Sequence, residues 1–321
     1  MGTHHHIFIH VLAIIAVAVI SSCASGEKGK KSAEVRTMHF PVIQAPSMME
    51  DGEKIEYLAE HFWTAYLEKG NSLATDSTVL GGVPREEVEQ AVSNYIILLS
   101  NMPLDKACKT VAGFTLALEK CGEADTSSVL SGELSALFAR YIYDPNSPLR
   151  DEDLYTPFAA GLSSCTRLDP AERASYAEDV RLTSLNRRGT KAADFSFVDR
   201  KGRRYTLYGI NAERTILFFS NPGCTACKEI IEALDSEPAV GAMIDDGTLA
   251  VLNIYIDEEI ADWMSYMPIY PEKWYNGYDD NHMIRDDELY NVRAIPSLYL
   301  LDADKTVLLK DVTTERLLNN L

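Results

Sequence analysis

Two cysteines separated by two residues, Cys224 and Cys227, are the side chains of this sequence that are best suited to chemistry. They follow a short apolar run and the turn signal Ser-Asn-Pro-Gly, which together predict a buried strand, and they precede a sequence typical of a helix. We therefore expect the pair on the first turn of that helix. A Cys-x-x-Cys at such a junction is typical of a thiol-disulfide redox site.

The two cysteines differ in their expected roles. Unpaired N–H groups and the helix dipole at a helix N-terminus favour a thiolate, which lowers the pKa of the first cysteine below the free value of about 8.5. Cys224 is therefore the expected nucleophile. Cys227, one turn deeper, is expected to resolve the mixed disulfide. Lys228 is predicted to be solvated.

A zinc site is the main chemical alternative for a Cys-x-x-Cys pair. Such a site needs a second Cys or His pair, and His282 is the only histidine after residue 188. His39 and His61 lie in the first half and have no partner pattern. The sequence therefore predicts no metal site and no cofactor apart from a redox-active Cys224–Cys227 disulfide.

Residues 189–321 supply the elements that would position this pair. Two alternating strands around the turn Asp199–Gly202 predict a hairpin. An apolar, β-rich strand follows the cysteine helix, and residues 258–290 combine a short helix with an aromatic, acidic insertion. The apolar strand is Leu249–Ile256, and the remaining predictions are the antiparallel pair 297–301 and 306–309 and a terminal helix over 314–320.

This order of elements resembles the TlpA/ResA-like branch of the thioredoxin family, whose members are exported, membrane-tethered thiol-disulfide proteins with an N-terminal hairpin. The resemblance covers about residues 190–321. Its second anchor is the segment Asn291–Ser297, which is similar to the family's segment with an Ile before a cis-proline. The resemblance implies that Pro296 is cis and that Ile295 presents its backbone to an incoming chain, so these two residues are the predicted substrate-binding residues.

Three positions depart from the family's pattern. Gly223 stands where a Trp is common, Phe218 where a buried acid is frequent, and Ile230 where the ResA type has a glutamate. Without an evident proton acceptor, turnover is expected to be slow unless an acid comes from elsewhere. Asp257 is a candidate for that acid, and a loop cap is its alternative role.

Four aromatic residues of the insertion also have two possible roles. They either line a substrate groove or pack the insertion, and packing is the favoured interpretation. They are Trp263, Trp274, Tyr275 and Tyr278.

Residues 40–188 predict an α-helical domain, because six segments repeat apolar residues with helical spacing. Pro84 is placed to open one helix, and Gly122 to cap the end of another. The sequence Asp169-Pro170-Ala171-Glu172 has the pattern of a capping box. A further stripe of four residues is expected on a single helix face: Ile55, Leu58, Phe62 and Tyr66.

The helical half carries little predicted chemistry. Its aromatic residues are interpreted as core, among them Trp63, Tyr95 and Phe114. The run Tyr141–Glu152 resembles a segment of the uncharacterised helical domains that precede thioredoxin-like domains in some bacterial lipoproteins. That resemblance implies an architecture and no activity.

Three cysteines of this half leave two alternatives open. Cys108 and Cys121 are one long helix apart, about 20 Å at a rise of 1.5 Å per residue, which is too far for a bridge. A disulfide between Cys121 and Cys165 is the first pairing to test, and it leaves Cys108 free. The alternative is that all three are small buried apolar residues.

The N-terminus has the pattern of an export signal. Ile7–Ile20 is apolar apart from His10 and is shorter than the roughly 20 residues needed to span a bilayer, which is typical of a secretory signal. The following residues, Ile20-Ser21-Ser22-Cys23, resemble the lipobox of bacterial lipoproteins, and this resemblance implies that Cys23 is lipidated. The region before the apolar run lacks Lys and Arg, which departs from that pattern.

The sequence as a whole predicts a signal peptide over 1–22, a lipidated tether over 23–39, a helical domain over 40–188 and a thioredoxin-like domain over 189–321. The fold class is α + α/β: the second domain has a central mixed sheet flanked by helices and begins with a β-hairpin. Thirty Lys and Arg against 48 Asp and Glu give a net charge of −18, which disfavours nucleic acid as a partner.

The predicted function is that of an exported, membrane-anchored thiol-disulfide oxidoreductase of the cell envelope, facing the periplasm or the surface. Its expected partners are protein thiols and disulfides and a membrane or periplasmic electron donor. Reductase, oxidase and isomerase remain alternatives. The competing hypothesis is a non-enzymatic surface lipoprotein, in which the helical domain binds a partner and the thioredoxin fold is a scaffold with a static disulfide.

Overall fold

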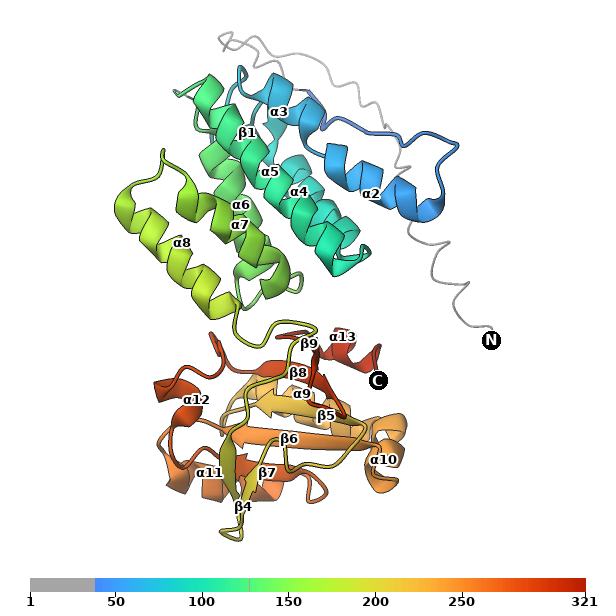
Figure 1. Ribbon diagram of the computed structural model, residues 1–321, viewed down its shortest axis with the longest axis vertical. Helices are drawn as coiled ribbons and strands as arrows, with labels where there is room; N and C mark the ends of the chain where they lie inside the picture. Colours follow the sequence, from blue (N-terminus) through green and yellow to red (C-terminus); the bar gives the residue numbers. More distant parts are fainter. Residues whose placement is uncertain (1–37, 127) are drawn as a thin grey trace, which may run out of the picture. The chain divides into compact units, whose positions relative to one another are not determined.

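The computed structural model describes residues 38–126 and 128–321, and the residues from 38 onward belong to one compact unit (Figure 1). The predicted signal peptide, Cys23 and the tether as far as residue 37 lie outside the described residues. None of the described helices is both long and apolar enough to cross a membrane.

The first half of the described chain is helical, as predicted. Its helices alternate a buried apolar face with an exposed one, and on the 85–100 helix Val88, Val92, Tyr95 and Leu99 are fully buried. Between residues 38 and 126 and between 128 and 188 the helices are α2 (Asp51–His61), α3 (Thr64–Gly70), α4 (Arg85–Ser100), α5 (Leu104–Ala124), α6 (Leu130–Tyr143), α7 (Glu152–Ser164) and α8 (Pro170–Thr183).

Aromatic rings form the centre of this helical core. Trp63 stacks on Phe114 with 5.3 Å between ring centroids, and Phe138 lies 4.9 Å from Phe158. Large rings bury much apolar area and gain further from such edge and offset contacts. The prediction that these aromatic residues are core is confirmed for Trp63, Tyr95 and Phe114, each at most 5% exposed.

Some local predictions for this half are confirmed and others are wrong. Asp169 and Glu172 form the predicted capping box of α8, and Pro84 immediately precedes α4. Gly122 does not end its helix, because α5 continues to Ala124. A Cβ at position 122 would overlap only the guanidinium of Arg167, the far end of a flexible side chain that can move aside.

The stripe from Ile55 to Tyr66 is not one helix face. The chain tightens at Phe62, whose N–H donates to the carbonyl of Ala59, and a new helix starts at Thr64. The break turns the Trp63 ring into the core. A short hairpin that the sequence did not predict, β1 (Val79–Leu80) with β2 (Val83–Pro84), then connects α3 to α4.

The disulfide considered between Cys121 and Cys165 is absent. Both are buried free thiols, one near the end of α5 and the other directly after α7. Cys108 is a free, half-buried thiol that donates to the carbonyl of Asp153 at 3.5 Å. The alternative, small cysteines packed as apolar side chains, is therefore correct for Cys121 and Cys165.

The second half is built on a mixed sheet of seven strands in the order β4-β3-β7-β6-β5-β8-β9. Strand β5 pairs parallel with the central strand β6 and antiparallel with β8, and the β3–β4 hairpin predicted from the sequence joins the sheet through β7. The strands are β3 (Ser196–Asp199), β4 (Arg204–Thr206), β5 (Arg214–Phe219), β6 (Leu249–Tyr255), β7 (Tyr275–Tyr278), β8 (Ser297–Asp302) and β9 (Val307–Leu309).

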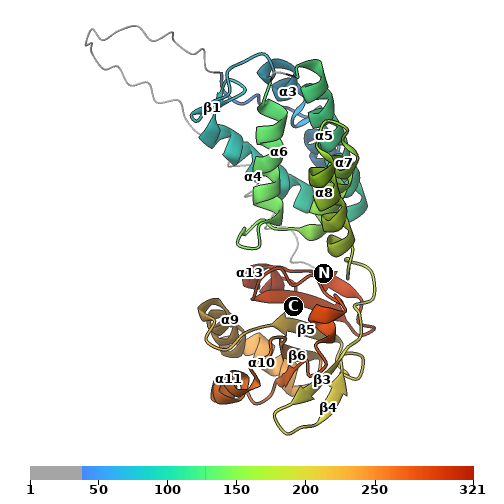
Figure 2. The same ribbon diagram turned by 90° about the vertical axis from the view of Figure 1, so that its left-hand side faces the viewer.

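Helices flank this sheet, as the fold class predicts, and Figure 2 shows α9, α10 and α11 on one side of it and the β3–β4 hairpin on the other. Ile216 and Phe218 of β5 face a core that includes α9, α11 and α13, whereas Leu217 and Phe219 face the hairpin side and α12. This alternation is the normal period of a strand. The helices are α9 (Thr225–Ser236), α10 (Pro238–Asp245), α11 (Ile260–Tyr266), α12 (Met283–Asp286) and α13 (Thr314–Leu318), with a 3₁₀ turn, η1, at Met267–Ile269.

The aromatic insertion contains a strand that the sequence did not predict. Tyr275–Tyr278 forms β7, which pairs parallel with β6 and antiparallel with β3. Trp263 is fully buried and Trp274 is 6% exposed, so these rings pack the insertion. The alternative of an aromatic substrate groove is therefore wrong for both tryptophans.

The contact of α5 with α7 depends on a glycine. A Cβ added at Gly161 would lie 2.5 Å from Cγ2 of the buried Thr115. Overpacking of this kind costs about 1–3 kcal/mol, against at most about 1 kcal/mol gained in helix propensity. We expect Gly161→Ala to lower the free energy of unfolding, measured by urea titration, by about 1 kcal/mol.

Gly113→Ala is the matched control, because position 113 also lies within a helix and has nothing within 4 Å of an added Cβ. This variant is expected to gain about 0.5–1 kcal/mol. An equal gain in both variants would contradict the close approach of the two helices.

Candidate functional site

The cysteine pair lies at the junction of β5 and α9. Cys224 is the residue before the first helical position, and Cys227 lies within the first turn. The two sulfurs form a disulfide, with 5.2 Å between the Cα atoms. The backbone N–H of Cys227 donates to Sγ of Cys224 at 3.1 Å. One backbone donor at the start of the helix therefore points toward the sulfur of Cys224.

The two cysteines are unequally exposed. Cys227 is 1% exposed and packs in the core against Phe218 and Ile231, whereas Cys224 is partly exposed. Lys228, on the same turn, is exposed and lies 3.6 Å from a carboxylate oxygen of Glu232, as expected for a solvated lysine. A reactant arriving from solvent can therefore reach Cys224 more readily than Cys227.

Gly223 has a conformational reason to replace the family's Trp. Its φ is +72°, a backbone conformation that favours glycine, and an added Cβ would find nothing within 4 Å. The backbone conformation, and not a lack of space for a side chain, therefore explains the glycine at position 223. The other two departures, Phe218 and Ile230, are both buried in the core with Cys227, so neither place offers a carboxylate.

The predicted substrate-binding residues lie beside the same end of the sheet. The Ile295–Pro296 bond is cis, as the resemblance implied. Ser297 begins β8 and pairs with Phe219, the last residue of β5. Because the turn to Cys224 starts directly after Phe219, the cis-proline loop and the disulfide turn leave the sheet from neighbouring strands.

Asp257 stabilises the turn that carries the cysteines. Its Oδ2 accepts a hydrogen bond of 2.6 Å from Nδ2 of Asn221, three residues before Cys224. This contact fits the loop-cap alternative for Asp257.

A cavity of about 610 Å³ adjoins this turn. In the sheet half, its walls come from the disulfide turn, the end of β6, the region of α12, and the segment that leads to the cis-proline. Residue 182 of α8 adds a wall from the helical half. The lining includes Leu182, Asn221, Asp257, Arg285, Arg293 and Ile295, so charges of both signs face it.

A buried row of hydrogen-bonded polar side chains lies below the turn, and the sequence did not predict it. Ser220 Oγ lies 2.5 Å from Oδ1 of Asn253, and Nδ2 of Asn253 donates to Oδ1 of Asn276 at 3.1 Å. All three residues are at most 4% exposed. An Asn in the middle of an apolar strand was the available signal, because buried amides need partners. The chain links the ends of β5, β6 and β7.

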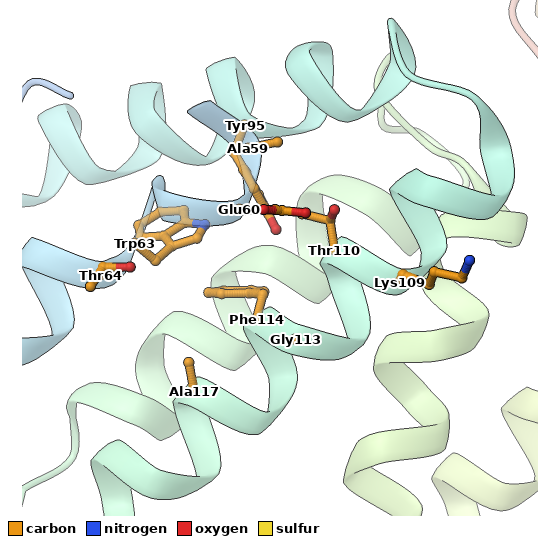
Figure 3. A pocket seen from close by; sticks show the side chains of 10 residues that line it. All are labelled: Ala59, Glu60, Trp63, Thr64, Tyr95, Lys109, Thr110, Gly113, Phe114 and Ala117. Carbon is orange, nitrogen blue, oxygen red and sulfur yellow. The ribbon is translucent and has the colours of Figure 1, made fainter. Parts of the chain in front are cut away.

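A second hollow, of about 340 Å³, lies in the helical half (Figure 3). Its inner wall is the aromatic core, with Trp63, Tyr95 and Phe114, and its lining also includes the exposed residues Glu60 and Lys109. The lining contains no cysteine or histidine. Throughout residues 38–126 and 128–321, no group of three or more His, Cys, Asp or Glu side chains is placed to hold a metal ion. The cysteine pair therefore remains the candidate site.

The surroundings of Cys108 and Cys121 lower the reactivity of these two thiols. Burial raises the pKa of Cys108, an effect that the nearby Arg187 opposes. Burial also raises the pKa of Cys121, opposed by Arg167. Since the thiolate is the nucleophile, a raised pKa lowers the reactive fraction at neutral pH.

Known proteins resemble this chain over most of its length. Residues 21–186 match a family described as a domain of unknown function, DUF5106. The chain is similar to the crystal structure of a thioredoxin-like protein from Bacteroides caccae, with 33% sequence identity and a TM-score of 0.75 over 89% of this chain and 98% of that one.

Two further structures each match less than half of the chain. One is the C-terminal domain of an uncharacterized protein from Bacteroides fragilis, with 46% identity and a TM-score of 0.41 over 42% of this chain and 97% of that one. The other is a domain of a possible thiol-disulfide isomerase from Cytophaga hutchinsonii, with 23% identity and a TM-score of 0.37 over 43% of this chain and 92% of that one. No curated protein matches the chain.

The unequal exposure of the cysteines predicts an order of alkylation. In the reduced protein at pH 7, a short pulse of iodoacetamide should modify Cys224 first and leave Cys227, Cys108 and Cys121 largely unmodified. At higher pH, alkylation of Cys108 and Cys121 should approach that of Cys224. Their pKa values are raised, so most of these two thiols are still protonated at pH 7 and ionise only as the pH rises. Peptide mass spectrometry measures each site, and the oxidised protein is the control. Modification of Cys227 ahead of Cys224 would contradict the geometry.

Proposed function

The chain belongs to the DUF5106 family and, through its second half, to the thioredoxin-like proteins, and on this premise we propose that it exchanges electrons with cysteines of other proteins through Cys224 and Cys227. The observation that carries the proposal is the disulfide at the start of α9, with one partly exposed and one buried sulfur. The helix N-terminus favours a thiolate at Cys224 once the pair is reduced.

The exchange proceeds in two balanced steps. The Cys224 thiolate attacks one sulfur of a substrate disulfide, which forms a mixed disulfide and releases the other substrate sulfur as a thiolate. Cys227 then loses its proton and attacks the sulfur of Cys224, which frees the second substrate sulfur to take up a proton. The substrate gains two electrons, and the Cys224–Cys227 pair is left oxidised. The reverse sequence oxidises a substrate dithiol, and the potential of the pair sets the direction.

The cis-proline loop is proposed to hold the substrate during this exchange. Ile295 and Pro296 would offer their backbone to the polypeptide that carries the target cysteine. The adjoining cavity, with Arg285 and Asp257 among its lining residues, accepts neighbouring side chains of either charge. Because no carboxylate occupies the positions of Phe218 and Ile230, the proton of Cys227 is expected to pass to solvent or to the leaving thiolate, and turnover is expected to be slow.

We also propose a location in the cell envelope. The apolar run before Cys23 and the lipobox-like Ile20-Ser21-Ser22-Cys23 support removal of residues 1–22 and lipidation of Cys23. The tether to residue 39 would then leave the folded chain beside a membrane, facing the periplasm or the surface. There it would meet protein thiols and disulfides and a membrane or periplasmic electron donor, in a compartment where disulfides persist.

Substitution of the two cysteines tests the exchange. Cys224→Ser should abolish insulin reduction, because it removes the nucleophile, and Cys227→Ala should accumulate mixed disulfides that non-reducing gels resolve. Cys108→Ser, which removes a thiol away from the pair, is the control and should keep wild-type activity. Equal activity of wild type and Cys224→Ser would contradict the proposal. A potential well below about −300 mV would favour a static scaffold disulfide instead.

Substitution of Cys23 tests the anchor. Cells that express the full chain should incorporate labelled palmitate into the wild-type protein and into the control Ser25→Ala, and both should sediment with membranes. Cys23→Ser lacks the thiol that would carry the lipid, so it should lose the label. Labelling of Cys23→Ser at the wild-type level would exclude lipidation at this residue.

A further inference from the structure

Three consecutive acidic residues at the start of α7 are buried. Asp151, Glu152 and Asp153 are 5%, 2% and 1% exposed. A buried carboxylate is costly unless cations and hydrogen-bond donors surround it. The cations and donors that surround these carboxylates therefore identify the segments that the start of α7 contacts.

Glu152 binds the segment that leads to the cis-proline. Its Oε1 accepts hydrogen bonds from Nδ2 of Asn291 and from Nε of Arg293, each at 2.8 Å. Its Oε2 lies 2.8 Å from Nζ of Lys310, whose side chain is 1% exposed. Burial raises the pKa of Glu152, and Lys310 and Arg293 oppose that rise. One carboxylate of the helical half thus holds two residues of the loop.

Arg293 is also fixed from its other sides. Its Nη1 donates to the backbone carbonyl of Tyr143, and its guanidinium carbon lies 4.0 Å from the centre of the Tyr143 ring. That ring stacks on Tyr155 of α7, with 3.8 Å between the centroids. A planar guanidinium held by a carboxylate, a carbonyl and an aromatic face has few alternative positions.

A second carboxylate holds the far side of the cis bond. Ser297 Oγ donates to Oδ1 of Asp311 at 2.9 Å, and Oδ2 of Asp311 lies 3.3 Å from Nη2 of Arg293. Residues on both sides of Ile295–Pro296 are therefore tied to carboxylates. Arg293 connects the two, because it pairs with Asp311 and with Glu152.

The same segment forms part of the cavity beside the disulfide turn. Arg293 and Ile295 line it together with Asn221 and with Leu182 of the helical half. A displacement of residues 291–295 would change both the shape of the cavity and the backbone that Ile295 offers. The hydrogen bonds of Glu152 to this segment therefore affect the proposed substrate site.

We propose that Glu152 is a positioning residue for thiol-disulfide exchange: from the helical half, it holds the cis-proline loop in the conformation that binds a substrate polypeptide next to Cys224. This inference rests on the proposed function and deepens it. The substrate class is an extended polypeptide that carries a cysteine, since the loop offers its backbone and the cavity that Ile295 and Asn221 line can take the neighbouring side chains. A small disulfide makes no use of the loop and is indifferent to Glu152.

Two variants test the position of the loop. In Glu152→Ala, kcat/KM for insulin should fall at least about tenfold, mainly through KM, because small misplacements of binding groups are expensive. The rate with the small disulfide 5,5′-dithiobis(2-nitrobenzoate) and the potential of the pair should change little. Glu152→Gln keeps an acceptor oxygen for Asn291 and Arg293 but loses the charge that pairs with Lys310. It should show an intermediate loss, and it remains informative if the alanine variant fails to fold.

Asp153→Asn is the matched control. Asp153 is a buried carboxylate of the same helix end, but its ion-pair partners are Arg187 and Arg188, which lie outside the loop. This variant should keep the wild-type ratio of the insulin rate to the small-disulfide rate, even if it unfolds more easily. The same selective loss in Asp153→Asn, or an equal loss for both substrates in Glu152→Ala, would overturn the assignment.

Hydrogen exchange separates this inference from the proposed function. Amides of residues 291–297 should exchange faster in Glu152→Gln than in the wild type, and unchanged exchange would overturn the positioning role whatever the activity. A wild-type protein that reduces neither insulin nor the small disulfide would instead contradict the proposed function.

Discussion

The burial of a charged carboxylate between two halves of one chain is the constraint on which the rest of this structure depends. Glu152 is 2% exposed, and it is accompanied by Arg293 and Lys310 from the sheet half. Removing one partner of such a group leaves an uncompensated charge, which typically costs about 3–5 kcal/mol. The helical and sheet halves therefore do not pack as independent surfaces. Their contact makes residues from 38 onward one compact unit.

The buried Glu152 is also connected to the candidate redox site. The partners of Glu152 lie a few residues before the cis Ile295–Pro296 bond, and β8 then begins next to the end of β5, from which the turn to Cys224 departs. The disulfide itself is supported locally by the start of α9. A DUF5106 domain in this chain is thus more than a spacer, because it supplies a wall and a holding carboxylate to the loop beside the cysteines.

Local sequence patterns predicted helix starts and strands well. They did not predict contacts between segments that are distant in the sequence. The capping box at Asp169 and the buried strand β5 are set by neighbouring residues, and both were predictable. Gly122 was wrongly predicted to cap its helix, because α5 continues past it to Ala124. Strand β7 was missed because its aromatic residues suit an insertion as well as a strand. Only pairing with β6 and β3 distinguishes the two.

By itself, the sequence determined which residues are the candidates for chemistry and where they lie along the chain. Two cysteines at a strand-to-helix junction and an Ile-Pro-Ser segment are local signals, and their physical effect, a helix N-terminus near one sulfur, is also local. The tertiary structure alone decided that Glu152, Arg293 and Lys310 meet, because acidic and basic residues are common and any of them can pair in solution. Burial selects among those pairings, and burial depends on how distant segments pack.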